Sequence, residues 1–176
     1  TRNSSSAASD VYKRQLVIGG AGYIGSHMVK LLGKKGHHVV TYDNLSEGHR
    51  GAVTHGLLIE GDLQDRPLIT TVLRDHQIDA VIHFAASALV GESVQNPAKY
   101  YQNNVVATFS LLEAMREAEV SKIVFSSTCA TFGQPQVIPI TERESQSPVN
   151  PYGFTKLVIE RMLADYSNAY GIGYAA

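Results

Sequence analysis

The chain of 176 residues has the length of one ordinary domain, and its composition, 44% hydrophobic and 18% charged, is that of a folded globular protein. Fifteen Lys and Arg oppose sixteen Asp and Glu, a balance that provides no basic surface for nucleic acid or anionic lipid. No apolar run approaches the ~20 residues that cross a bilayer, and one cysteine cannot form an internal disulfide. These features indicate a cytoplasmic protein without nucleic-acid or membrane partners.

The first fifteen residues differ from the rest of the chain. They are small and polar, do not begin with Met, and lack the apolar centre of a signal peptide. We interpret residues 1–15 as a non-native or disordered tail and assign the folded domain to residues 16–176.

Short apolar segments recur from Leu16 onward, separated by stretches with helical periodicity. Five of them are predicted strands, at residues 16–18, 39–43, 57–59, 80–84 and 122–126. Their alternation with amphipathic helices predicts βαβ units, and therefore an α/β fold with a doubly wound parallel sheet covered on both faces. Another apolar run begins at Ile172, so we expect the sheet to be incomplete where the chain stops.

The helices between these strands are predicted from apolar spacing and from capping residues. The inward face of the first helix is expected to be Ile24, Met28, Leu31 and Leu32. This helix is expected to end near Gly36, and a longer helix to run from Tyr101 to Met115. Asp65 and Asn150, each close to a proline, are predicted to start two more helices.

The first predicted strand leads directly into the glycine-rich segment GGAGYIG, residues 19–25. This segment fits G-x-G-x-x-G from Gly20 and G-x-x-G-x-x-G from Gly19. Such a pattern between a strand and a helix lets backbone N–H groups approach a pyrophosphate, whose charge the helix N-terminus attracts. We therefore predict that Gly19, Gly22 and Gly25 bind a dinucleotide.

Two aspartates follow the next two strands at the same predicted edge of the sheet. Asp43 lies 18 residues after Gly25, where a carboxylate accepts a hydrogen bond from the adenosine ribose and repels a 2′-phosphate. This favours NAD, although His49 and Arg50 leave an NADP alternative open. Asp62 either accepts from the adenine amino group or caps the next helix.

The proton-transfer groups are predicted near the end of the chain. Tyr152 and Lys156 are four residues apart on a predicted helix, so they share one face, and the ammonium stabilises the phenolate that a base requires. The fifth strand ends in Ser126, Ser127 and Thr128, any of which can hydrogen-bond a substrate oxygen. Spacing does not choose among these three hydroxyls.

At these residues the sequence resembles the extended short-chain dehydrogenase/reductase family and, within it, the nucleotide-sugar 4-epimerases. The matching segments are GGAGYIGSH, TYDNLSEGH, GDLQD, VIHFAA, LVGESVQNP, YYQNNV, FSSTCATFG, PITE and NPYGFTK. The resemblance extends from Leu16 to Ala176 and implies a Rossmann fold.

The resemblance also implies roles for individual residues. Tyr152 falls on the family's catalytic base, Lys156 on its electrostatic and ribose-binding partner, and Thr128 on the Ser/Thr that contacts the substrate together with Tyr152. The other implied cofactor contacts are Tyr23, Ile24, Asp43, Asn44, Asp62, Leu63, Phe84, Ala85, Ala86, Ala88 and Asn103.

The activity that the resemblance implies is interconversion of UDP-glucose and UDP-galactose through a 4-keto intermediate. Tyr152 takes the proton of the sugar 4-hydroxyl while hydride passes from C4 to tightly bound NAD and later returns to the other face. The related dehydratases carry an Asp-Glu pair where this chain has Cys129 and Ala130, which argues against elimination. A UDP-pentose or UDP-uronate 4-epimerase, or a non-catalytic NAD-binding regulator, remains an alternative.

The sequence departs from the family pattern in three ways. Ile18 replaces a usual threonine, and Ala88 falls where some members carry a lysine that contacts the cofactor. The C-terminal substrate domain has no counterpart, so we expect the domain to be truncated and the chain alone to bind NAD weakly without epimerase activity. Many relatives pair through two helices, which leaves a homodimer of the full-length protein open.

Other residues that can carry chemistry are interpreted structurally. We expect Cys129 to be a small core residue and His83 a packed, hydrogen-bonded histidine, and we predict no metal site. Gly153, inside a helix, is explained either by close approach of the cofactor or by tolerance of a weak first turn.

Overall fold

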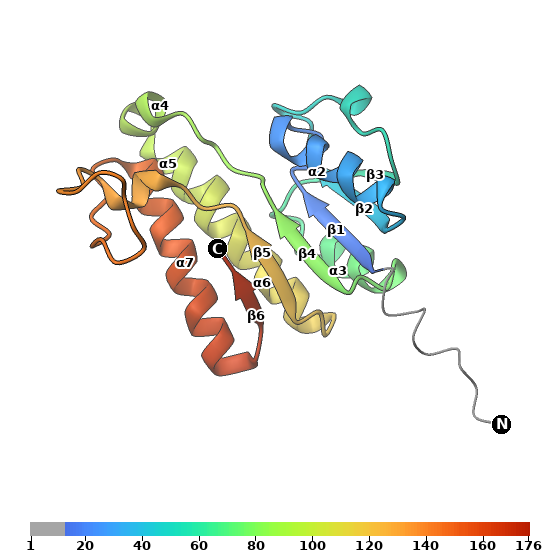
Figure 1. Cartoon of the computed structure of the whole chain (residues 1–176). Coiled ribbons are helices and arrows are strands. Elements are labelled where there is room, and N and C mark those ends of the chain that lie inside the picture. Colours follow the sequence, from blue (N-terminus) through green and yellow to red (C-terminus); the bar gives the residue numbers. More distant parts are fainter. Residues whose placement is uncertain (1–12) are drawn as a thin grey trace.

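The strands form one parallel sheet in a computed structural model that describes residues 13–176 (Figure 1). The sheet has six strands in the order β3-β2-β1-β4-β5-β6. They are β1 (Arg14–Ile18), β2 (His38–Asp43), β3 (Leu57–Glu60), β4 (Ala80–His83), β5 (Lys122–Phe125) and β6 (Gly173–Ala175). This order confirms the predicted doubly wound α/β fold, and the run from Ile172 supplies the sixth strand.

Helical segments connect successive strands. They are α2 (Tyr23–Lys34), η1 (Arg50–Ala52), α3 (Arg66–Asp75), α4 (Val90–Gln95), α5 (Pro97–Tyr100), η2 (Tyr101–Val106), α6 (Ala107–Glu117), η3 (Cys129–Phe132) and α7 (Pro151–Tyr170). The predicted long helix is confirmed as α5, η2 and α6 in succession, with η2 a π-helical stretch. β1 begins at Arg14, two residues before the predicted start. Of the proposed tail, residues 1–12 lie outside the described residues, and Lys13 directly precedes β1.

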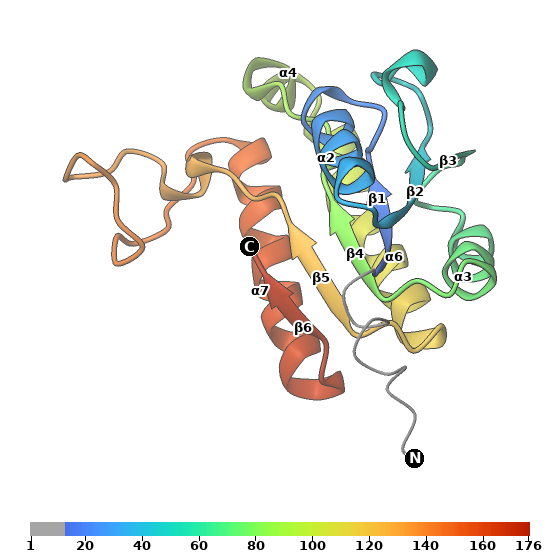
Figure 2. The ribbon, with the colours of Figure 1, turned by 45° about the vertical axis from the view of Figure 1, so that its right-hand side comes forward.

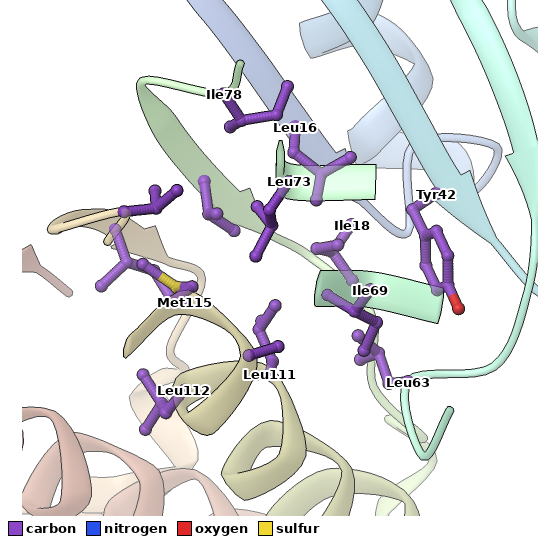
Figure 3. Packing of buried hydrophobic residues seen from close by; sticks show 14 of the residues in the cluster. Leu16, Ile18, Tyr42, Leu63, Ile69, Leu73, Ile78, Leu111, Leu112 and Met115 are labelled. Carbon is purple, nitrogen blue, oxygen red and sulfur yellow. The ribbon is translucent and has the colours of Figure 1, made fainter. Parts of the chain in front are cut away.

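Most of the core lies between the sheet and the helices α3, α6 and α7 (Figure 3). Leu16 and Ile18 of β1 pack there with Leu111 and Met115 of α6, and all four side chains are buried. α2 packs on the opposite face, as Figure 2 shows, over a smaller cluster that includes Val17.

Helices lie on both faces of the sheet, as predicted, but among the described residues the second face is covered only in part. α2 packs over β1 and β2. Val124 of β5 and Tyr174 of β6 remain 49% and 42% exposed. Burial therefore ends where the sheet extends beyond α2.

The predicted inward face of the first helix also needs correction. Ile24 and Leu31 are 59% and 48% exposed, whereas Gly25, Val29 and Leu32 face the sheet. Because Gly25 has no side chain, the helix approaches the glycine loop closely, and this fixes the inward stripe one residue later than the apolar spacing predicts.

The helix ends agree with the predicted capping residues. Gly36 has a φ of +82° and donates to Gly33 O, while His37 donates to Leu32 O, which together close α2 in a Schellman motif. Asp65 accepts a hydrogen bond from Leu68 N at the start of α3. Thus local sequence signals set these boundaries.

Candidate functional site

A pocket of about 520 Å³ opens at the carboxyl ends of β1, β2, β3 and β4. Ligands of open α/β sheets bind at this edge. The following predicted cofactor residues line the pocket: Gly19, Gly22, Tyr23, Ile24, Gly25, Asp43, Asn44, Asp62, Leu63, Phe84, Ala85, Ala86 and Asn103. Residues from five separate segments of the sequence are therefore brought to one cavity.

The glycine loop packs too tightly to accept side chains. Gly19 has a φ of +74°, and a Cβ there would lie 2.6 Å from Ala85 N. A Cβ on Gly25 would lie 2.1 Å from Gly19 O. Gly22, the N-cap of α2, offers no side chain to the N–H groups of the first turn. These N–H groups have no intrahelical acceptors, so the pocket wall presents donors suited to an anion.

Asp43 holds the glycine loop against the end of β2. Its buried carboxylate accepts from Ala21 N at 2.9 Å through Oδ2 and from Leu45 N at 2.9 Å through Oδ1. Each carboxylate oxygen can accept a second hydrogen bond, so Asp43 can also bind a ribose hydroxyl at the pocket wall.

Asp62 does not cap the following helix, and that alternative is wrong. Its Oδ1 accepts from Gln64 N at 2.9 Å, and its Oδ2 accepts from Asn44 Nδ2 at 3.0 Å. Asp65 supplies the cap of α3 instead. Asp62 is thereby fixed in the loop after β3, on the pocket wall.

The hydroxyls at the end of β5 have different partners. Ser127 Oγ donates to the Glu160 carboxylate, so its proton is already engaged. Thr128 Oγ1 accepts from Ala130 N at 3.2 Å, which leaves its own proton free to donate. The structure therefore separates two of the three hydroxyls that spacing alone could not distinguish.

Lys156 is buried one helical turn from Tyr152 on α7, with only 2% of its surface exposed. Its Nζ donates to Ser126 O at 2.8 Å and lies 4.5 Å from the centre of the Phe125 ring. Burial lowers the pKa of Lys156 to about 8. The Tyr152 ring packs edge-on against Tyr100, with the ring centres 6.4 Å apart.

Gly153 lets the β5 end approach α7. A Cβ on Gly153 would lie 2.5 Å from Ala130 O, so the turn η3 that follows Thr128 rests directly on the first turn of α7. The close neighbour is the chain's own backbone, which gives this glycine a structural reason that the sequence did not indicate. Thr128 and Tyr152 are consequently carried by two segments in backbone contact.

Three other predicted residues have clear outcomes. Ala88 is exposed and is not among the residues that line the pocket. Cys129 is exposed, so its assignment to the core was wrong, because η3 turns it outward. His83 is buried with Nε2 2.9 Å from Thr108 Oγ1, as expected of a packed histidine, and burial lowers its pKa to about 3.

Sequence reasoning missed part of the pocket wall. The segment 46–48 returns to the glycine loop, where a Cβ on Gly48 would lie 2.9 Å from Ala21 C and His49 N donates to Ala21 O. Gly48, which follows the second strand, could have indicated this close approach of the chain to the glycine loop. Lys99 and Ser87 also line the pocket, and Lys99 lies on a separate short helix that no motif marks.

Residues 13–176 contain no cluster of three His, Cys, Asp or Glu side chains arranged to hold a metal ion. Within the same residues, every helix is too short or too polar to cross a membrane.

Comparison with known proteins identifies the relatives of the chain. A family model described as GDP-mannose 4,6 dehydratase matches residues 16–176. The chain is 53% identical over 159 residues to UDP-glucose 4-epimerase of Halalkalibacterium halodurans and 52% identical over 162 residues to that of Lactobacillus helveticus. These matches cover 90% and 92% of this chain but 48% and 49% of the relatives. The chain thus spans about half the length of the curated relatives it matches.

Solved structures of the same enzyme are also similar. UDP-glucose 4-epimerase from Brucella ovis in complex with NAD has 54% identity and a TM-score of 0.91, over 92% of this chain and 50% of that one. The enzyme from Thermotoga maritima with UDP-glucose has 35% identity and a TM-score of 0.88, over 92% and 53% of the two chains.

Proposed function

Because the chain belongs to the GDP-mannose 4,6 dehydratase family of extended short-chain dehydrogenase/reductases, we propose that it is the NAD-binding half of a UDP-sugar 4-epimerase. The proposed substrates are UDP-glucose and UDP-galactose. The observation that carries the proposal is the pocket of about 520 Å³ at the glycine loop, where α2 begins without a side-chain cap. Similarity to UDP-glucose 4-epimerases supports the substrate class.

The pocket fits a dinucleotide that lacks a 2′-phosphate. Side chains at Gly19 and Gly25 would collide with backbone, so the loop keeps its N–H groups open to a diphosphate. Asp43 places a carboxylate on the wall, which favours a ribose hydroxyl over a phosphate. Arg50, the candidate for NADP, forms an ion pair with Glu60 and is not a lining residue. These features support NAD.

The chain's own residues perform the proton transfers in this proposal. Bound NAD would accept hydride from the sugar C4 and return it. Tyr152 takes the proton of the 4-hydroxyl and gives it back, while the free hydroxyl proton of Thr128 hydrogen-bonds the same oxygen. Lys156, still mostly protonated at pH 7, stabilises the negative charge on Tyr152 and binds the cofactor ribose.

Epimerisation is preferred over dehydration because the turn after Thr128 lacks acid and base. Cys129 is exposed there and Ala130 has no functional group, so neither position carries the carboxyl group that serves as acid or base in elimination. The UDP-pentose and UDP-uronate alternatives differ only in the sugar, so they are distinguished by which UDP-sugar the full-length protein turns over.

The test uses the full-length protein with UDP-galactose, and the formation of UDP-glucose is measured. Replacing Tyr152 by Phe is expected to lower kcat by about 1000-fold while NAD remains bound, because the general base is lost. Tyr174→Phe, which alters an exposed tyrosine of β6, is the matched control and should keep wild-type kcat. Unchanged turnover of Tyr152→Phe would contradict the proposed base. Bound NAD without turnover of any UDP-sugar would favour a non-catalytic regulator.

The full-length protein is also proposed to form a homodimer. Exposed apolar side chains on η2, α6 and α7 support this: Tyr101, Val106, Phe109 and Phe154. Phe109→Glu should shift the sedimentation coefficient toward that of a monomer, whereas Ile138→Glu in an exposed loop should not. A monomeric wild-type protein would refute this part.

A further inference from the structure

The charges on the pocket wall are poorly matched to a dinucleotide, with one exception. Three acidic side chains, Asp43, Glu47 and Asp62, line the pocket. Lys99 is the only Lys or Arg among the lining residues of the described chain. A diphosphate carries two negative charges, and a helix N-terminus offers only about half a positive charge. Lys99 is therefore the single full positive charge that the wall can offer such a ligand.

Lys99 is held at the wall by a connected set of contacts. Its Nζ lies 2.6 Å from Glu92 Oε1. Glu92 Oε2 in turn lies 2.8 Å from the hydroxyl of Tyr100, a fully buried residue that also contacts the backbone of Leu89. Hydrogen bonds from Lys99 and Tyr100 lower the pKa of Glu92, so its carboxylate is ionised at neutral pH. The ammonium is thereby positioned before any ligand arrives.

The ion pair by itself explains little of this arrangement. The side chains of Lys99 and Glu92 are 43% and 34% exposed, and pairs of this exposure contribute little to stability. Little is lost when the ammonium turns from the carboxylate to a phosphate, which also accepts a charge-assisted hydrogen bond. The same Tyr100 that anchors Glu92 packs against Tyr152, so the short helix that carries Lys99 also contacts α7.

We propose that Lys99 binds the diphosphate of the dinucleotide and that it leaves its ion pair with Glu92 to make that contact. The proposal rests on the NAD-binding function proposed above and adds a residue that no glycine motif or strand-end position marks. It assigns to the segment 92–99 a role in cofactor affinity in addition to its role in packing.

Calorimetric titration with NAD, ADP-ribose and adenosine separates this contact from others in the pocket. Lys99→Gln is expected to weaken NAD and ADP-ribose by about tenfold, the value of one charge-assisted contact, and to leave adenosine unchanged. The affinity of Lys99→Gln for NAD should also depend less on salt than that of the wild type, and Lys99→Arg should restore most of the lost affinity. Lys122→Gln removes an exposed lysine at the opposite end of β5 and is the charge-matched control.

Glu92→Gln distinguishes a ligand contact from a structural ion pair. Both variants break the pair, so a purely structural role predicts equal losses of NAD affinity for Lys99→Gln and Glu92→Gln. Our proposal predicts that Glu92→Gln binds NAD at least as tightly as Lys122→Gln, because a competing carboxylate is neutralised while the ammonium remains. Equal NAD affinity of Lys99→Gln and Lys122→Gln would overturn the role of Lys99 alone. A wild-type protein that binds no NAD would overturn the proposed function with it.

Discussion

Helices α2 and α7 begin in opposite ways, although both begin at the edge of the sheet where the pocket and the proposed catalytic side chains lie. α2 begins at Gly22, which provides no side-chain acceptor for the first-turn N–H groups. α7 begins at Asn150, whose Oδ1 accepts from Gly153 N at 2.8 Å, and Pro151 occupies its first position. One helix keeps its N–H groups available to a ligand, and the other satisfies them within the chain.

The same comparison explains how the two helices contribute to the site. The first turn of α2 acts through its backbone, so Gly25 brings that turn against Gly19. The first turn of α7 acts through side chains, so its backbone is fixed by the cap and by contact with η3, and Tyr152 and Lys156 project from a rigid helix. In α2, glycine allows peptide groups to face the pocket, whereas in α7 the cap fixes the backbone that carries the two side chains.

The strongest test of this comparison is Gly25→Ala. The added Cβ would lie 2.1 Å from Gly19 O, so either the loop or the helix must move. Overpacking of this kind costs about 3 kcal/mol, and we expect NAD affinity to fall by about 100-fold. Gly51→Ala is the matched control, because nothing lies within 4 Å of its Cβ, and it should bind NAD normally in the same calorimetric titration. Normal NAD affinity of Gly25→Ala would show that the loop does not depend on close backbone approach.

The second test varies the pH, because two ionisable side chains, Lys156 of α7 and His83 of β4, are buried. Burial, with a smaller contribution from Lys156, lowers the pKa of His83 to about 3. The unfolded chain therefore binds this proton near pH 6.5 while the folded protein excludes it, so stability is lost as pH falls from about 6.5 toward 3. Between pH 7 and pH 5 we expect His83 to account for a loss of about 2 kcal/mol in the free energy of unfolding.

Urea denaturation at both pH values measures this loss for the wild type and for His83→Gln. The variant should lose about 2 kcal/mol less than the wild type on acidification, whatever its stability at pH 7. His38→Gln, at an exposed histidine, should behave as the wild type does. Equal losses for His83→Gln and the wild type would show that His83 is protonated in the folded protein.

The features that sequence predicts well are those set by neighbouring residues. Apolar runs located five strands, and Asp65, Gly36 and Asn150 marked helix ends because caps act within one turn. The glycine pattern located the loop because only glycine permits its backbone contacts. These signals determine the fold class and most of the pocket wall.

The features that sequence missed depend on contacts between distant segments. The inward face of α2 is shifted because Gly25, which is not counted as apolar, is buried against Gly19 and Gly20 of the glycine loop. Cys129 is exposed because η3 packs on α7 through Ala130, a contact that no local pattern encodes. Lys99 reaches the pocket only because α5 packs beside the loop after β4. Such positions follow from tertiary packing and require the structure.

The smallest expected effect comes from removing the cap of α7. Asn150→Ala leaves Gly153 N without its acceptor and should lower the free energy of unfolding by about 1 kcal/mol, as measured by urea denaturation. Asn150→Asp keeps an acceptor oxygen at the same position and should retain wild-type stability. Because the first turn carries Tyr152, Asn150→Ala should also lower kcat of the full-length protein while NAD affinity, which depends on α2, stays unchanged. Equal weakening of NAD affinity and kcat by Asn150→Ala would show that the two helix ends do not act separately.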